Sequence, residues 1–350
     1  MATILKKTQV YFLLAFVQLI WLLDAMTGRV FELVVVLSSK AFSAVFSLGL
    51  IFFIAYSIKT SYMYQVGIGV LAHMFYFDSQ VSYSNVLGAA NRYKEKPKPI
   101  ADIEFPEISA KAFLIADRGN KKILKDKNST QRLASASTTK LMTALVALDV
   151  YTPEEEVSVS QKCADIEGTK IGLSADTKYH ASDMLQAMLV GSAADAACAL
   201  SESKTELDEF LYLMNQKAYN LNIKSSYFTN PVGLDGENNS HFSTAQDLYK
   251  LAVAATDENL IRQAVKAKEY LIKSTDEKFI GKVENTNKLL FEIPQSIGIK
   301  TGTTSEAGQV LIYEFKDAQK DLVIIVMGSE DRFTDTRALL NWALLSYSWD

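Results

Sequence analysis

A serine and a lysine stand one helical turn apart at the start of an apolar stretch. The segment ASTTKLMTALVAL contains Ser137 and Lys140 and has the periodicity of a helix. Residues three apart share a helix face, so the amine can reach the hydroxyl. Burial or a second cation lowers the pKa of a lysine, and a neutral Lys140 could then activate Ser137 as a nucleophile. Taken alone, the spacing favours the ordinary alternative, an N-cap serine followed by a surface lysine.

Two further segments carry groups that could complete such a site. In GIKTGTTSEAG, Lys300 and Thr301 on a strand would offer an ammonium and a hydroxyl to a carboxylate, and Gly302 would let a substrate backbone approach. In LVGSAADAACAL, the Ser192 hydroxyl could lie at the same site. The alternatives are an ordinary strand end and turn for the first segment, and for the second an N-cap Ser192 with Asp195 three residues on.

Strands at both ends of the globular part, with helices between them, predict an α+β domain. The terminal strands are expected to share one antiparallel sheet. The expected strands are KAFLIAD with KKILKD as a partner, then GQVLIYEF and DLVIIVMG joined as a hairpin. The expected helices cover residues 137–149, 182–201 and 333–347.

The first eighty residues predict a membrane anchor. Residues 41–58 are uncharged and long enough to nearly cross a hydrocarbon layer, and residues 9–26 and 62–77 are weaker candidate spans. A buried helical bundle is the alternative. Lys6 and Lys7 favour a cytoplasmic N-terminus. Sequence alone leaves two or three spans open for residues 1–80, followed by an extended linker over residues 81–105 and a folded domain over residues 106–350.

Composition argues against several classes of protein. The net charge of −4 and the lack of a basic cluster argue against a nucleic-acid partner. No HExxH or CxxC motif occurs, so neither a metal nor another cofactor is expected. For Cys163 and Cys198, two buried free thiols are favoured over one disulfide. A Ser-His-Asp hydrolase is disfavoured, because the histidines are few and no GxSxG elbow is present.

Taken together, the three motifs resemble those of the serine D-alanyl-D-alanine carboxypeptidases, the low-molecular-weight penicillin-binding proteins. The resemblance runs from about residue 105 to residue 349 and includes TNPVGLDGENNSHFSTAQDL, NTNKLL and ALLNWAL. It implies the penicillin-binding-protein/β-lactamase-like transpeptidase fold, with an antiparallel sheet and a helical lobe, here behind the transmembrane anchor. A β-lactamase usually has Ser-Asp-Asn as its second motif, which this chain lacks.

The resemblance also implies roles for the site residues. Ser137 would be acylated, Lys140 would be its base, and Ser192 would relay a proton to the leaving D-alanine. Lys300, Thr301 and Gly302 would bind the substrate, and the N–H groups of Ser137 and Thr303 would form the oxyanion hole. The substrate would be a peptidoglycan stem peptide, with β-lactams as inhibitors. Such a substrate lies outside a bacterial cell membrane, which selects three spans over two and an extracytoplasmic catalytic domain.

Two positions depart from the family pattern. The second motif normally reads Ser-x-Asn, but Ala194 stands at its third position. That asparagine usually contacts the lysine and the substrate amide, so its absence keeps open a catalytically impaired protein that binds penicillin or senses peptidoglycan. Val232 replaces the histidine of NPHGLD, with a consequence that the sequence does not reveal.

Overall fold

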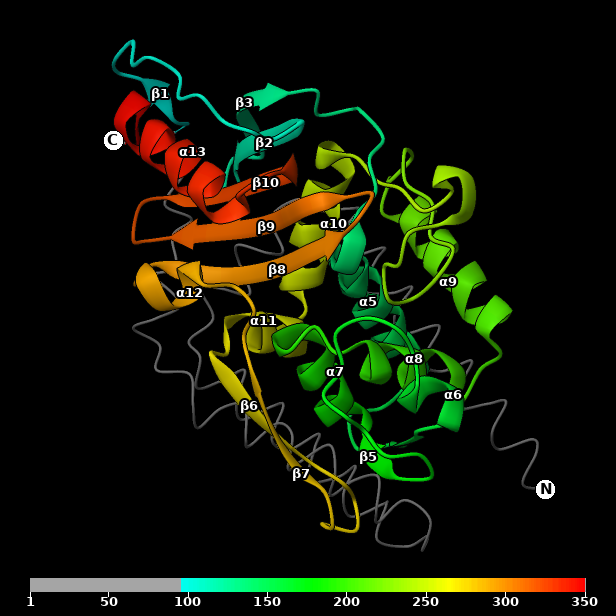
Figure 1. Ribbon diagram of the computed structural model, residues 1–350. Helices are drawn as coiled ribbons and strands as arrows, with labels where there is room; N and C mark the ends of the chain where they lie inside the picture. The colour runs from blue at the N-terminus through cyan, green and yellow to red at the C-terminus, as the bar shows by residue number, and fades with distance from the viewer. Residues whose placement is uncertain (1–95, 350) are drawn as a thin grey trace, which may run out of the picture. The chain divides into compact units, whose positions relative to one another are not determined.

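The computed structural model describes residues 96–349, and a five-stranded antiparallel sheet lies at their centre (Figure 1). Its strand order is β3–β2–β10–β9–β8. β2, near the start of the domain, pairs with β10, near its end, and β3 pairs with β2 at the edge, which confirms the expected shared sheet. The bounds are β2 Ala112–Asp117, β3 Lys122–Lys127, β8 Ser296–Thr304, β9 Gly308–Lys316 and β10 Asp321–Ser329.

Apolar layers cover both faces of the sheet, which explains why its central strands are apolar throughout. Successive side chains of a strand point to opposite faces. Leu114 on β2 and Ile325 on β10 therefore join the larger core with the helical lobe. Ile115 and Ile324 point the other way, into a second core with α13 (Arg332–Ser346). Figure 1 shows α13 along this second face.

The helical lobe follows β3 and ends before β8. Its long segments are α5 Lys140–Val150, α7 Ala181–Val190, α8 Ala194–Glu202, α9 Leu207–Asn220, α10 Ala245–Asp257 and α11 Asn259–Lys266. Its short elements are η1 Ala136–Thr139, β4 Glu156–Ser158, α6 Gln161–Ala164, β5 Lys178–His180, η2 Glu237–Asn239, β6 Glu269–Lys273, β7 Ile280–Glu284 and α12 Leu289–Glu292. The helix expected over residues 182–201 is broken into α7 and α8, with Gly191, Ser192 and Ala193 between them.

Residues 96–105, from the predicted linker, lie against the end of the chain. β1 (Lys98–Pro99) pairs with β11 (Tyr347–Ser348), and the Phe105 ring stacks on Phe113 and meets Trp342 edge-on. The predicted membrane anchor and the rest of the linker lie outside the described residues. Within residues 96–349, no helix has the length and apolar character needed to span a membrane.

The two cysteines form a disulfide, so the favoured interpretation of two free thiols was wrong. Cys163 on α6 and Cys198 on α8 have Cα atoms 5.3 Å apart and are joined through their sulfurs. Both are buried, as expected, but burial alone does not distinguish a free thiol from a bonded one. The pairing depends on α6 packing across α8, which the sequence pattern did not predict.

Candidate active site

Ser137 and Lys140 meet at the junction of η1 and α5. The Lys140 Nζ atom lies 2.9 Å from the Ser137 Oγ atom and donates a second hydrogen bond of 2.6 Å to the Val232 carbonyl. Lys140 is 2 % exposed, which excludes the surface-lysine alternative. Burial lowers the pKa of Lys140 from 10.5 to about 7, although the negative charge of Asp195 opposes the shift. A substantial fraction of the amine is therefore neutral near pH 7 and able to accept a proton.

The loop before η2 holds the acceptor of Lys140. The Asn230 side-chain oxygen accepts hydrogen bonds from the backbone N–H groups of Val232, Gly233 and Leu234, which fixes the turn. Gly233 has a φ of +84°, and a Cβ there would stand 2.0 Å from the Ala136 carbonyl oxygen. The Val232 side chain packs in the core, whereas its carbonyl contacts the lysine. The histidine-to-valine departure therefore leaves this backbone contact in place.

His241 is part of the structure that supports this site. The Thr229 N–H donates to His241 Nδ1 at 3.1 Å, so Nδ1 is the unprotonated nitrogen and Nε2 donates to Thr139 Oγ1 at 2.7 Å. Burial lowers the pKa of His241 to about 4, which keeps the ring neutral. His241 thus connects the loop around Val232 to the segment that carries Ser137. The His241 ring is hydrogen-bonded to Thr139 and not to the Ser137 hydroxyl. In a Ser-His-Asp hydrolase the histidine would be hydrogen-bonded to the nucleophilic serine.

Ser192 lies in the break between α7 and α8, in a left-handed backbone conformation with a φ of 57°. It does not cap α8, because Ala193 is the N-cap residue and makes no side-chain cap hydrogen bond. Asp195 instead binds the loop after α6. The negative charge of Asp195, three residues after Ser192, acts on Lys140, so the start of α8 lies near Lys140.

Strand β8 places the third motif against the serine. β8 is an edge strand of the sheet and passes η1 so closely that a Cβ on Gly302 would stand 2.8 Å from the Ser137 nitrogen. Lys300 is buried, and burial lowers its pKa, assisted by the positive charges of Lys140 and Arg332. Its Nζ atom donates to the Thr301 carbonyl at 3.1 Å. Thr301 therefore contacts Lys300, which in turn lies close enough to Lys140 for their charges to interact.

Arg332 is a site residue that the sequence did not reveal. Its Nη1 atom donates to the Gly302 carbonyl at 2.8 Å and to Thr303 Oγ1 at 2.6 Å. The Asp331 side chain caps α13 and places Arg332 in the first helical turn. An Asp before an apolar helix is a readable start signal, but its position beside β8 depends on the sheet order. Thr286, whose hydroxyl lies 2.5 Å from that of Thr301, was missed for the same reason.

Lys140, Lys300 and Arg332 thus bring three basic groups together beside Ser137. The repulsion that acts on Lys300 comes from the other two groups, so all three are close in space. An anion bound near Lys300 would relieve this repulsion. The arrangement suits a substrate with a carboxylate close to the bond that the serine attacks.

A family model for D-alanyl-D-alanine carboxypeptidases matches residues 99–331. The chain belongs to this family. Among curated members, it is 32 % identical to the D-alanyl-D-alanine carboxypeptidase DacF of Bacillus subtilis, over 68 % of this chain and 63 % of that protein. It is 30 % identical to the D-alanyl-D-alanine endopeptidase of Escherichia coli, over 68 % of this chain and 78 % of that protein. The chain thus spans less than two thirds of the length of its Bacillus relative.

Solved structures of penicillin-binding proteins share this carboxypeptidase-family fold. The Streptomyces K15 DD-transpeptidase matches with a TM-score of 0.65 and 26 % identity, covering 69 % of this chain and 99 % of that one. A putative penicillin-binding protein homologue from Mycobacterium tuberculosis matches with a TM-score of 0.66 and 27 % identity, covering 71 % of this chain and 95 % of that one. These matches confirm the expected α+β transpeptidase-like fold.

Proposed function

We propose that this protein is a membrane-anchored serine D-alanyl-D-alanine carboxypeptidase that removes the terminal D-alanine of peptidoglycan stem peptides. The observation that carries the proposal is the 2.9 Å contact between a buried Lys140 and Ser137, directly beneath β8. Neutral Lys140 takes the Ser137 proton as the serine oxygen attacks the D-alanyl carbonyl. The backbone N–H groups of Ser137 and Thr303 stabilise the negative charge that develops on the carbonyl oxygen.

The remaining steps use the other two motifs. The terminal carboxylate binds near Lys300 and Thr301, where the Arg332 guanidinium adds a further positive group. Ser192 passes a proton to the nitrogen of the departing D-alanine as the C–N bond breaks, and it takes a replacement proton from protonated Lys140, which becomes neutral again. Water then attacks the acyl-enzyme and gives a proton to Lys140. Lys140 returns this proton to the Ser137 oxygen as the ester C–O bond breaks, and the shortened peptide leaves as a carboxylate. β-Lactams would acylate the same serine and inhibit the enzyme.

The proposed substrate implies a catalytic domain on the extracytoplasmic side of a bacterial membrane. The disulfide supports this location, since such bonds persist mainly in oxidising compartments. The hydrophobic segments before residue 80 support attachment to lipid.

A second candidate function is favoured by Ala194. Alanine offers no side-chain hydrogen bond to Lys140 or to a substrate amide, so the protein would capture β-lactams or bind peptidoglycan with impaired turnover.

Mass spectrometry of the protein after exposure to benzylpenicillin tests the nucleophile. We expect the adduct on the peptide that contains Ser137 and its loss in Ser137→Ala. An adduct on Ser192, or none on the folded protein, would contradict the proposed mechanism. Release of D-alanine from a peptide ending in D-Ala-D-Ala then separates the two functions: turnover supports the carboxypeptidase, and penicillin capture without turnover supports the binding protein.

A further inference from the structure

The disulfide joins the two segments that surround the second motif. Cys198 lies on α8, which begins two residues after Ser192, and Cys163 lies on α6, which leads into residues 165–173. We call residues 165–173 the α6 loop. A covalent bond between α6 and α8 therefore limits how far the α6 loop can move from α8, the helix that follows Ser192.

The α6 loop lies directly on the first turn of α8. The Ala194 N–H donates to the Thr169 carbonyl at 2.7 Å, and a Cβ on Gly168 would stand 3.5 Å from the Ala194 Cβ. The buried Asp195 carboxylate accepts from the N–H groups of residues 171, 172 and 173 at 3.1, 3.0 and 3.1 Å. The disulfide and the Asp195 carboxylate thus attach the loop to α8 at both of its ends.

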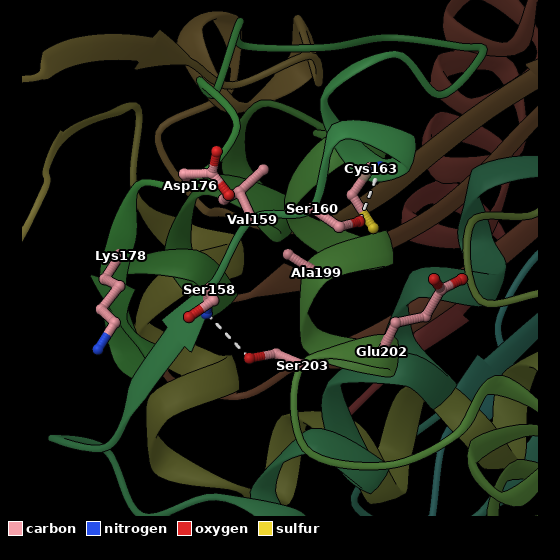
Figure 2. A pocket seen from close by; sticks show the side chains of 9 residues that line it. All are labelled: Ser158, Val159, Ser160, Cys163, Asp176, Lys178, Ala199, Glu202 and Ser203. Atoms are coloured by element: carbon pink, nitrogen blue, oxygen red, sulfur yellow. Dashed lines mark hydrogen bonds between the residues drawn. The ribbon is translucent and has the colours of Figure 1, made fainter.

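The outer side of the junction is hollow, which increases the importance of the covalent bond. A pocket of about 470 Å³ adjoins the junction, and Figure 2 shows the side chains that line it, among them Cys163 on α6 and Ala199 on α8. Two weaker links supplement the disulfide. The Ser158 N–H donates to Ser203 Oγ at 2.9 Å, and Lys162 forms an ion pair with Glu202 in which the lysine is mostly exposed. Exposed ion pairs fix geometry weakly. The pocket is lined by Ser158, Val159, Ser160, Cys163, Asp176, Lys178, Ala199, Glu202 and Ser203.

We propose that the Cys163–Cys198 disulfide, acting through the α6 loop, positions Ser192 for proton transfer to the leaving group. This inference rests on the proposed function. Ala194 cannot fix this segment through a side-chain hydrogen bond, whereas its backbone N–H is fixed by the loop. Ser192 has a left-handed backbone conformation between α7 and α8, so its position depends on how the segments on either side of it are held. The cysteines are therefore positioning residues that act without touching substrate.

The test compares the full-length protein with its Cys163→Ala/Cys198→Ala variant. We expect kcat for a D-Ala-D-Ala peptide to fall roughly 10- to 100-fold, because a small misplacement of a reacting group has effects of that order. KM should change much less, because the carboxylate site around Lys300 and Arg332 lies on other elements. Ala194→Asn should raise kcat more in the cysteine-free protein than in the wild type, since an amide would then replace the lost restraint.

A matched control separates positioning from general stability. Leu339→Ala removes a buried contact between α13 and the far face of the sheet, so it lowers stability without touching α6 or α8. All proteins are assayed at a temperature where each is fully folded. We expect Leu339→Ala to keep kcat within about twofold, whereas the cysteine-free variant does not.

Hydrogen exchange gives a readout that does not depend on catalysis. The N–H groups of residues 171–173 should exchange faster in the cysteine-free variant, with α5 unchanged. Wild-type kcat in that variant would overturn the inference, whether or not the α6 loop exchanges faster. Slower turnover with unchanged exchange would overturn it as well. If the wild-type protein is never acylated at Ser137, the proposed function fails, and the exchange data still show whether the disulfide holds the loop.

Discussion

The Lys140 amine is the residue on which the proposed chemistry most depends. Burial favours its neutral form, while Asp195 favours the charged form, and the balance brings its pKa to about 7. A lysine at the usual pKa would be protonated and inert as a base. The buried Lys140 amine also lies within hydrogen-bond distance of Ser137. Burial thus accounts for the neutral form of the amine at the place where the base is needed.

The rate of acylation by benzylpenicillin should therefore depend on pH in a defined direction. Because the base must be neutral, the rate should rise with pH up to about 7 and level off above it. Stopped-flow or quenched measurements between about pH 5 and pH 9 would check this profile. His241 has a pKa of about 4 and stays neutral over this range, so it should not contribute. A flat profile would show that Lys140 is not the base.

Ala194→Asn tests how much the absence of a side-chain amide at position 194 lowers catalytic efficiency. We expect the substitution to raise kcat/KM for a D-Ala-D-Ala peptide, by roughly tenfold for each ~1.4 kcal/mol of transition-state stabilisation recovered. Benzylpenicillin acylation should gain less, because a strained lactam needs less help from positioning. Ala194→Leu is the control, since it adds similar bulk beside Gly168 without an amide. An equal effect of both substitutions, or no gain from asparagine, would show that another group fills the role.

Sequence reasoning brought together the proposed catalytic pair but not its surroundings. Ser137 and Lys140 are three residues apart, so local spacing predicted their contact, whereas only the three motifs together favoured a catalytic role. The acceptor of Lys140 is the Val232 carbonyl, and a backbone oxygen carries no signature of residue type. His241 and Arg332 reach the site through tertiary contacts between segments far apart in the chain, which no local pattern encodes.

At the scale of elements, the site depends on how closely β8 passes η1. Gly302 permits that approach, because any side chain at this position would meet the Ser137 nitrogen and the Ala136 Cβ at 2.8 and 2.9 Å. The nearest atoms are backbone and a short side chain, which cannot rotate away. The close approach of β8 to η1 thus requires a glycine at position 302.

Gly302→Ala should push β8 away from η1 and disrupt the proposed oxyanion hole, which the N–H groups of Ser137 and Thr303 would form. We expect penicillin acylation to fall roughly 100-fold or more, the order found when an oxyanion donor is lost. Gly281→Ala on β7 is the matched control, because the nearest atoms there belong to the Phe279 ring, which can move. Acylation kinetics with thermal unfolding would check both variants. Normal acylation by folded Gly302→Ala would contradict the assigned geometry.

The break between α7 and α8 was predicted only in part. Residues 182–201 are rich in helix formers, which predicts helical structure, and an N-cap Ser192 after Gly191 also allowed a helix to begin inside this range. The structure places Ser192 at a positive φ between two helices, stabilised by the contacts of the next turn with the α6 loop. Tertiary contacts therefore overrode local propensity at a proposed catalytic residue.

At the scale of the described domain, the two ends of the chain segment are held together. β2 pairs with β10, and β1 pairs with β11. The apolar terminal strands made the shared sheet predictable. The pairing of Lys98–Pro99 was not, since charged and proline-containing residues carry a weak strand signal. The membrane anchor remains a prediction from residues 1–80.

The orientation of the whole protein in the membrane can be tested through an exposed loop. Asn238 and Asn239 are exposed on η2, and the two native cysteines are buried in a disulfide, so one cysteine introduced as Asn239→Cys would be the single reactive thiol of the chain. Because the proposed substrate lies outside the membrane, we expect a membrane-impermeant maleimide to label this variant on intact cells, or on spheroplasts where an outer layer blocks the reagent. The wild-type protein is the control for reaction at the native cysteines. Labelling that requires lysis would place residues 106–350 in the cytoplasm, and would contradict both the three-span prediction and a role in trimming stem peptides.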